Sequence, residues 1–309
     1  MANSVEAVWK TIREITLDDI RKASRLPVKV ALVGVDDDLA WLQAHFRGRT
    51  SHEGDLRRTA DSLRFFELPI GPDDEGSINK CTFACVSPAG STGLFQSGTV
   101  IKVPIFTIGT EGEWDHFKRE ILDSRWDLHL TLGRNFPGIR PDVLDYVIRN
   151  TACVNAEVAI VSGALFNIPS IGPIYPGVAF GDTVILTKNQ VMMAFRLAGA
   201  CGHAVDIVHR KTEVISIIGG GLGWRTLARA AAGAIPVLGI PLKGAFAFAG
   251  TFAVGKSLAH FLDTGRRLEP KTEQRIYADA VESGKVFASD TLRRLTRRQK
   301  AFRRRGRRT

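Results

Sequence analysis

The pattern of apolar and polar positions changes along the chain, and each change marks a different kind of element. Residues 5–25 have the apolar spacing of an amphipathic helix in two parts, with Thr16 and Asp19 placed as a capping box for the second part. Val28–Gly34 is a β-branched apolar run that ends in glycine, which indicates a buried strand entering a loop. Residues 36–46 then predict a short helix.

Three further apolar runs follow at 62–70, 81–88 and 103–109, separated by turns rich in glycine, proline and serine. Strands that alternate with helical or loop segments indicate an α/β domain with a largely parallel sheet. We therefore predict an α/β domain at residues 27–112, preceded by a helical segment at 1–26. The stretch Pro88–Gly93 resembles a nucleophile turn only loosely and is expected to be a surface loop.

The period becomes helical from Glu113 onward. Residues 113–130 predict one amphipathic helix that ends by Gly133, and Pro141 occupies the favoured first position of the next helix. Thr187 and Gln190 form a capping box that predicts the start of another helix. Residues 113–268 are therefore expected to form an all-α, hydrophobic helical domain.

The most apolar part of that domain consists of two runs on either side of Lys243. Residues 230–242 give 13 uncharged positions and residues 244–255 give 12. A membrane-spanning helix needs about 20 apolar residues. Neither run is long enough alone, and two prolines and the lysine argue against one continuous span. We predict an apolar helical hairpin at 230–262 that dips into one leaflet or packs in a core, with one long span as the alternative.

The last segment, residues 269–309, is charged again. Pro270 in a first turn and Gly284 beyond the last predict a helix between them. Thereafter Leu292, Leu295 and Phe302 fall near one face of a helix that is otherwise covered by arginine. A narrow apolar stripe beside a cationic face is typical of a helix that lies on a membrane surface.

The net charge of +10 resides entirely in this end of the chain. Ten of the 42 Lys and Arg residues follow Thr291, with no acid among them, and the remaining 32 equal the 32 acidic residues in number. We call residues 291–309 the basic tail. Such a tail binds polyanions, so its expected partners are anionic lipids or, as an alternative, nucleic acid. The residues expected to make these contacts are Arg293, Arg294, Arg297, Arg298, Lys300, Arg303, Arg304, Arg305, Arg307 and Arg308.

One stretch, GTFAVGKS at 250–257, fits the phosphate-loop pattern G-x-x-x-x-G-K-[ST]. If it bound a nucleotide, the residues responsible would be Gly250, Gly255, Lys256 and Ser257. A phosphate loop follows a buried strand and opens a helix, whereas these residues lie in helical, apolar surroundings. Nucleotide hydrolysis here is therefore the disfavoured alternative. We predict instead that the stretch is the packed turn of the hairpin, with both glycines at close helix contacts and the lysine at its polar end.

Four motifs give the chain a resemblance to a known family. They are LGRNFP at 132–137, LTKNQ at 186–190, GWRTLAR at 223–229 and AGTFAVG at 249–255. Over roughly 130 residues the chain resembles the bacterial domain-of-unknown-function family 697. That hydrophobic helical domain is often found behind Era-like GTPase domains, and it is usually described as membrane-associated. The family has no agreed catalytic residues.

The resemblance implies that residues 27–112 are a GTPase-type domain, but its signatures are missing. After Gly34 the chain reads Val-Asp-Asp-Asp, with no phosphate-loop lysine or hydroxyl. Glu67–Gly71 stands where D-x-x-G belongs, and Thr110–Glu113 stands where N-K-x-D belongs. We therefore expect a degenerate, pseudo-GTPase domain in a non-catalytic scaffold or adaptor, with a protein partner on the α/β domain.

The remaining candidates concern location. Trp224, Arg225 and Arg229 lie at the edge of the apolar region, where Trp and Arg anchor helices at a bilayer interface, although an ordinary core tryptophan explains them equally well. The N-terminus lacks a secretory signal, and the four cysteines lack redox or zinc spacing. We predict a protein on the cytoplasmic face of a bacterial membrane, without a metal or cofactor.

Overall fold

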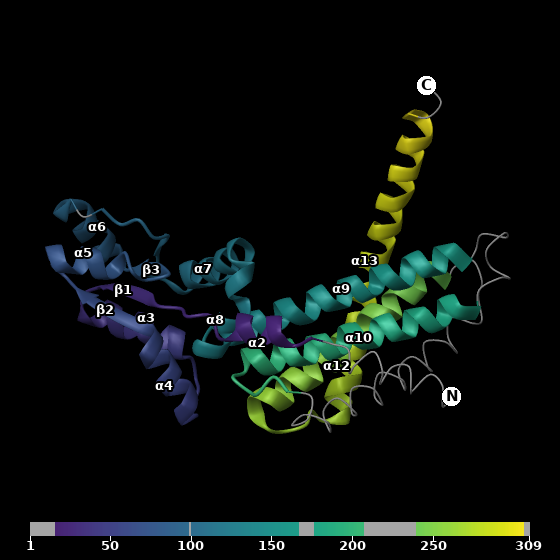
Figure 1. The fold of residues 1–309 in the computed structure, drawn as a ribbon, viewed down its shortest axis with the longest axis horizontal. Coiled ribbons are helices and arrows are strands. Elements are labelled where there is room, and N and C mark those ends of the chain that lie inside the picture. Colours follow the sequence, from purple (N-terminus) through teal and green to yellow (C-terminus); the bar gives the residue numbers. More distant parts are fainter. Residues whose placement is uncertain (1–15, 99, 167–175, 207–238, 306–309) are drawn as a thin grey trace. The chain divides into compact units, whose positions relative to one another are not determined.

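The computed structural model describes residues 16–98, 100–166, 176–206 and 239–305 (Figure 1). The chain divides into two compact units. Asp18–Leu144 and Ala198–Val205 form the first, which we call the sheet unit. The second, the helical unit, contains the described parts of Asp145–Leu197 and of the chain from Asp206 onward.

The sheet unit is built on four parallel strands. They are β1 (Val30–Gly34), β2 (Leu63–Glu67), β3 (Phe83–Val86) and β4 (Ile105–Thr107), and their spatial order is β2-β1-β3-β4. Each strand lies within an apolar run from which it was predicted. The central strands β1 and β3 are buried along their whole length, as expected for parallel strands covered on both faces. The predicted parallel α/β sheet is therefore confirmed.

Helices cover both faces of this sheet. They are α3 (Asp36–Arg47), α4 (Glu53–Ser62), α5 (Pro72–Ile78), α6 (Pro88–Ser97) and α7 (Glu111–Ser124). On one face Ala31, Val33 and Val86 pack with residues from the α5 and α6 regions. On the other face an aromatic cluster joins the sheet to α3 and α7, with Phe83 and Phe46 both beside Phe117. The expected surface loop at Pro88–Gly93 is instead the start of α6.

The single helix predicted at 113–130 is interrupted. Helix α7 ends at Ser124, a 3-10 turn spans Trp126–Leu128, and α8 runs from His129 to Asn135. At the break Arg125 leaves helical geometry (φ −125°, ψ 59°), and its guanidinium pairs with Asp127 at 3.0 Å. Because Trp114 and Phe117 pack in the aromatic cluster, α7 stays with the sheet. The sheet unit therefore extends to Leu144, past the predicted boundary at 112.

Helix α2 lies in the sheet unit, and α9 and α10 each have residues in both units. Helix α2 (Asp18–Ser24) occupies the second part of the predicted N-terminal helix. Helix α9 (Arg140–Phe166) has Pro141 in its first turn, as predicted. Helix α10 spans Pro176–Ala200, so the helix start predicted at Thr187 is wrong. Thr187 and Gln190 are buried in the middle of α10, and Gln190 donates a hydrogen bond to Thr251 of α12 in place of the expected capping role.

In the helical unit, the described part of the predicted hairpin at 230–262 is a single helix. Helix α12 is continuous from Gly239 to Thr264, and residues 230–238 lie outside the described part of the chain. Pro241 is tolerated because the first turn of a helix does not use its N–H groups. After a turn at Gly265 (φ +70°), α13 (Pro270–Arg305) returns along α12. Phe248 and Ala249 of α12, Ala280 of α13 and Ala152 of α9 form the shared core.

Gly284 does not end a helix, because α13 continues through it as one unbroken element (Figure 1). A Cβ atom at this position would lie 2.7 Å from the carbonyl oxygen of Ala245 in α12. The glycine therefore marks the close approach of two helices. The same antiparallel register brings Gly244 next to Ala288, so the residues after Asp290 extend beyond the described start of α12.

Candidate functional site

The sheet order creates a topological switch point between β1 and β3. The chain leaves β1 toward β2 on one side and later returns to add β3 on the other side. In open parallel sheets, ligands bind outside the carboxyl ends of the strands at such a point, because the flanking loops diverge there. If the sheet unit bound a nucleotide, the loops after β1, β2, β3 and β4 would therefore form the site.

The loop after β1 is packed too tightly to be a phosphate cradle. A Cβ atom on Gly34 would lie 2.8 Å from Ser87 Oγ, which itself accepts a hydrogen bond from the Gly90 N–H at 3.0 Å. Gly34 is therefore required for the close packing of two loops. The first turn of α3 then carries Asp36, Asp37 and Asp38, whose charges repel a phosphate.

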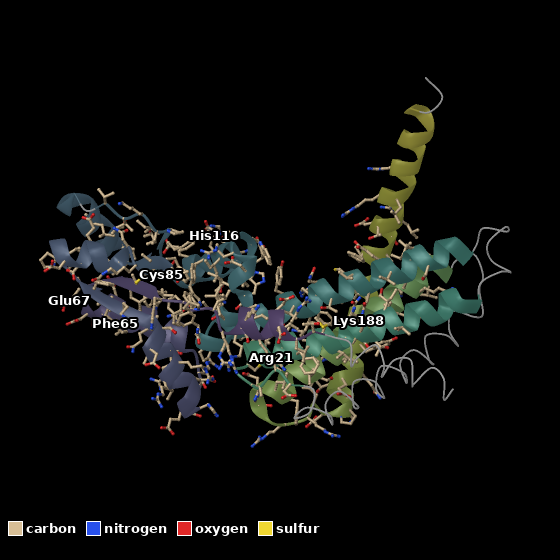
Figure 2. The ribbon with its side chains drawn as sticks, viewed as in Figure 1. Arg21, Phe65, Glu67, Cys85, His116 and Lys188 are labelled. Carbon is tan, nitrogen blue, oxygen red and sulfur yellow. The ribbon has the colours of Figure 1, made fainter. Side chains whose placement is uncertain are left out.

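Two of the acidic residues after the other strands, Asp74 and Glu113, cap helices. Glu113 accepts hydrogen bonds from the Gly109 N–H at 2.8 Å and from Thr110 Oγ1 at 3.1 Å, and the Glu113 N–H donates to Thr110 Oγ1. The Gly109 N–H and then the Thr110 hydroxyl lower the pKa of Glu113 below its ordinary value. Likewise the Gly71 N–H donates to Asp74 at the start of α5. Glu67, at the end of β2, is exposed (Figure 2).

The carboxyl edge of the sheet consequently carries one sign of charge. The segments 34–38, 67–71 and 107–113 contain carboxylates, segment 87–90 is uncharged, and none of the four contains Lys or Arg. Thr110 and Glu113 form a capping box, and Gly34 is a close contact that is followed by three acids. This edge cannot hold a nucleoside triphosphate in the manner of a GTPase.

The phosphate-loop-like stretch at 250–257 lies in the interior of α12. It is therefore neither a loop nor the predicted turn of a hairpin, since its backbone N–H groups belong to the helical hydrogen-bond ladder. The predicted close helix contact at Gly255 is confirmed, because a Cβ atom there would lie 2.8 Å from Ile148 of α9. Gly250 and Ser257 are likewise helical residues.

Lys256 makes a structural contact and is not at the end of a hairpin. Its ammonium group forms an ion pair with Asp145 of α9 and lies 5.6 Å from the ring centroid of Phe252. Arg149 lies over the same ring at 5.6 Å. Through these contacts Lys256 links α9 to α12.

Replacing Lys256 by alanine tests the nucleotide alternative. We expect calorimetric titration with ATP or GTP and magnesium to be flat for the native chain and for Lys256→Ala. The loss of a partly exposed ion pair should lower the free energy of unfolding by at most about 1 kcal/mol. Lys188→Ala, at an exposed position on α10 (Figure 2), is the matched control. Micromolar nucleotide binding that disappears only in Lys256→Ala would restore the phosphate-loop interpretation.

A buried polar network joins α9, α10 and α12 within the apolar helical unit. Asn155 Nδ2 donates to Thr251 Oγ1 at 2.9 Å, Asn189 Nδ2 donates to Asn155 Oδ1 at 2.8 Å, and Gln190 Nε2 donates to Thr251 Oγ1 at 3.3 Å. Asn155 is fully buried. Because an unmade hydrogen bond is costly in such surroundings, the network fixes the relative register of three helices. The sequence pattern did not indicate these contacts.

The basic tail is helical as far as Arg305, as the amphipathic pattern predicted. Arg293, Arg294 and Arg297 are exposed on α13, and the nearest acid to Arg293 is Asp290 at 3.8 Å. The helix backbone also includes Arg298, Lys300, Arg303, Arg304 and Arg305. Arg307, Arg308, Trp224, Arg225 and Arg229 lie outside the described residues.

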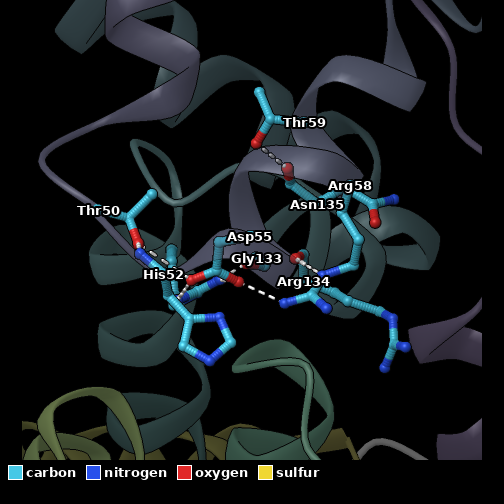
Figure 3. A network of polar contacts seen from close by, with 9 residues as sticks. Thr50, His52, Asp55, Arg58, Thr59, Gly133, Arg134 and Asn135 are labelled. Atoms are coloured by element: carbon cyan, nitrogen blue, oxygen red, sulfur yellow. Dashed lines mark hydrogen bonds and ion pairs between the residues drawn. The ribbon is translucent and has the colours of Figure 1, made fainter.

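A second polar network, in the sheet unit, was also missed by sequence reasoning (Figure 3). Asp55 of α4 receives two hydrogen bonds from Arg140, at 3.0 and 2.7 Å, and both side chains are only 6% exposed. Arg58 also pairs with Asp55, and Thr50 Oγ1 donates to it at 3.3 Å. Burial raises the pKa of Asp55, but the hydrogen bonds and charges of the two arginines outweigh it and hold the pKa below its ordinary value.

This network fastens α4 to the segment that carries the LGRNFP motif. Arg140 Nε donates to the Gly133 carbonyl at 2.9 Å, Arg58 Nε to the Arg134 carbonyl at 3.2 Å and Thr59 Oγ1 to the Asn135 carbonyl at 2.7 Å. These three carbonyls belong to the last turn of α8 and lack partners within their own helix. Side chains of α4 and α9 thus supply the hydrogen-bond donors for the last carbonyl groups of α8.

The chain was compared with protein-family models, with curated proteins and with solved structures, and none of them matches it.

Proposed function

We propose that the protein is a non-catalytic scaffold or adaptor that associates with the cytoplasmic face of a bacterial membrane. In this proposal the sheet unit is a pseudo-GTPase domain that binds a protein partner, and the helical unit is a member of the domain-of-unknown-function family 697. The observation that carries the proposal is helix α13. Its first part packs against α12, the most apolar of the described helices, and its last part presents exposed arginines.

The acidic carboxyl edge of the sheet supports the non-catalytic part of the proposal. Phosphoryl transfer depends on cationic groups that neutralise the developing charge on the phosphates. The corresponding loops here supply carboxylates and helix caps. A surface of this kind suits recognition of a protein with complementary charge better than it suits nucleotide chemistry.

Helix α12 supports membrane association only in a restricted form. Pro241–Thr264, with 24 residues, a mean hydropathy of 1.3 and half of its most apolar window buried, is long and apolar enough to cross a bilayer. Yet α13 packs along it and exposes Asp279, Glu282 and Lys285 on the outer side. Each such charge would cost about 2.5–3.5 kcal/mol at the centre of a bilayer. With α13 in place, peripheral attachment through the basic tail is therefore the favoured mode.

The basic tail has the charge needed for that attachment. Basic residues near an anionic bilayer contribute about 1 kcal/mol each, and the effect is screened by salt. Even if only a few of the ten basic residues bind lipid at once, their combined binding free energy exceeds that of most single contacts. The stripe of Leu292 and Leu295 would add apolar insertion to this attraction.

Deleting residues 291–309 tests the proposal. We expect the full chain to sediment with vesicles that contain phosphatidylserine but much less with pure phosphatidylcholine, and we expect the deletion to weaken the former at least tenfold. Raising the salt concentration should weaken binding of the full chain as well. Equal sedimentation of the full and truncated chains with anionic vesicles would contradict the proposal.

Nucleic-acid binding through the same tail is the second candidate, favoured by the density of arginine alone. A variant with Leu292→Ser and Leu295→Ser keeps every charge and removes the described apolar stripe. Lower binding to vesicles with unchanged binding to duplex DNA or RNA would indicate that the tail is built for a membrane. Tight, salt-sensitive binding to nucleic acid with no vesicle binding would favour the second candidate.

A further inference from the structure

Strand β2 forms one open edge of the sheet. In the order β2-β1-β3-β4 it pairs with β1 on one side, and within the described residues no strand lies on its other side. An edge strand presents backbone N–H and C=O groups with which a further strand can pair. The strand runs from Leu63 to Glu67 without a proline. This edge is therefore long and regular enough to accept another strand.

The pairing with β1 determines which residues of β2 face outward. The Leu68 N–H donates to the Gly34 carbonyl at 3.2 Å, so the backbone groups of Leu68 point toward β1. Successive residues of a strand direct these groups to opposite sides. The backbone groups of Leu63, Phe65 and Glu67 therefore point away from β1. Phe65 is the centre of this outward-facing set.

Phe65 also places an aromatic side chain at the edge. It is 46% exposed, whereas Leu63 and Phe66 are buried. Phe65 and Glu67 lie along β2 at the margin of the sheet unit (Figure 2). A regular edge strand with an exposed apolar side chain at its centre favours pairing with another chain.

The opposite edge of the sheet is less suited to pairing. Strand β4 has only three residues, Ile105–Thr107. Very short edge strands are one of the means by which natural sheets prevent pairing with another chain. Ile105 is 45% exposed, almost as much as Phe65. The two edges thus carry similar apolar side chains but differ in the length of backbone that they offer.

Charge is distributed unevenly along β2. Arg64 lies near the start of the strand, where its Nη1 donates to the Leu63 carbonyl at 2.6 Å. Lys29 and Asp61 are at the same end, which carries a formal charge of +1. Glu67 ends the strand at the carboxyl edge, where three aspartates follow β1. Two antiparallel copies of β2 would therefore place the basic end of each beside the acidic end of the other, whereas parallel copies would place like charges together.

We propose that β2 is a self-association edge, through which two copies of the chain join their sheets with the two β2 strands antiparallel and the two Phe65 residues opposite each other. In this register the outward-facing residues meet. The two Phe65 residues exchange N–H···O=C bonds, and the Glu67 N–H of each copy donates to the Leu63 carbonyl of the other. That carbonyl can accept this bond beside the one from Arg64, because its oxygen has two lone pairs. The Leu63 N–H takes no part, since it bonds to the Thr59 carbonyl at the end of α4.

The aromatic side chains and the symmetry favour the same register. Directly opposite side chains of an antiparallel pair have Cβ atoms about 4.5–5.5 Å apart, so the two phenyl rings would contact each other and lose exposure to water. A twofold axis passes between the two Phe65 residues, so both copies use the same surface and assembly stops at the dimer. The interface is small, which predicts a weak dimer. This inference goes beyond the proposed membrane role and does not depend on it.

Sedimentation equilibrium of the full-length chain without lipid, over a range of protein concentrations, tests the proposal. We expect a monomer–dimer equilibrium whose dissociation constant rises about tenfold or more in Phe65→Lys, because two like charges then lie opposite each other. Ile105→Lys is the matched control, since it adds the same charge at an equally exposed apolar position on β4. Its dissociation constant should equal that of the native chain. Circular dichroism during thermal unfolding shows whether each variant is folded.

Cysteine cross-linking tests the register independently of the lysine variant. The Cα atoms of a hydrogen-bonded antiparallel pair are about 5.5 Å apart, within the range that a disulfide bridges. Phe65→Cys should therefore form a disulfide-linked dimer under mild oxidation. The two copies of residue 67 would lie roughly 13 Å apart along the ladder, too far for a disulfide. Glu67→Cys, at an exposed position, should cross-link no faster than the native chain, which controls for the four natural cysteines.

The outcomes that would overturn the proposal are distinct. A chain that stays monomeric at every concentration, with no faster cross-linking in Phe65→Cys, would leave the edge to a strand of a different protein. A dimer whose dissociation constant is the same in Phe65→Lys would lie on another surface. Equal cross-linking of Phe65→Cys and Glu67→Cys would contradict the register. Growth beyond the dimer would contradict the closed symmetry, because the pairing leaves no β2 edge unused.

Discussion

Replacing Arg140 by methionine should lower the free energy of unfolding by about 3–5 kcal/mol, because it leaves the buried carboxylate of Asp55 without its main partner. Arg140 donates two hydrogen bonds to Asp55 and one to the Gly133 carbonyl, and because the side chains of Arg140 and Asp55 are only 6% exposed, water does not replace these bonds. Chemical denaturation followed by circular dichroism measures the loss. Arg119→Met, on the exposed face of α7, should change stability little and is the control.

The same variant should change the pH dependence of stability. The folded pKa of Asp55 lies below its ordinary value, so this group stabilises the native chain at neutral pH, and that contribution is lost as the pH falls through the folded pKa. In Arg140→Met the unpaired carboxylate is relieved by protonation. The stability deficit of the variant should therefore narrow as the pH is lowered from about 7 toward 3. A deficit that is constant over this range would show that Asp55 is not the cause.

Replacing Gly284 by alanine should destabilise the α12–α13 pair by about 1–3 kcal/mol. The added methyl group would overlap the backbone of Ala245, with distances of 2.7 Å to its carbonyl oxygen and 2.9 Å to its Cα atom. Helix propensity acts in the opposite direction, since alanine is better than glycine inside a helix by roughly 1 kcal/mol. The sign of the measured change therefore shows which effect dominates.

Ser283→Ala provides the control for this measurement. Ser283 is the exposed neighbour of Gly284 on α13, and its side chain bonds only to the Asp279 carbonyl of its own helix. This substitution should be close to neutral. If Gly284→Ala were more stable than the native chain, the close contact between α12 and α13 would be contradicted.

The elements with strong local patterns were predictable from the sequence. The four strands lie in the four apolar runs, because a parallel strand covered on both faces must be apolar throughout. Predictions from the local pattern were wrong where a residue contacts a part of the chain that is distant in sequence. Thr187 and Gln190 match a capping box, yet both lie inside the continuous helix α10. Gln190 instead forms a hydrogen bond with Thr251, 61 positions away. Gly284 matches a helix end but is required by Ala245 of another helix.

The candidate sites also differ in whether the sequence alone or the tertiary structure determined them. The sequence alone determined that three aspartates follow Gly34 and that the excess positive charge lies in the basic tail, because residue types at known positions are read directly from it. Only the tertiary structure decided that GTFAVGKS is the interior of a helix and that Asp55 meets Arg58 and Arg140. The physical reason is that a local pattern records the period and charge of a segment, whereas burial, close approach and charge balance depend on residues that the fold brings together from distant positions.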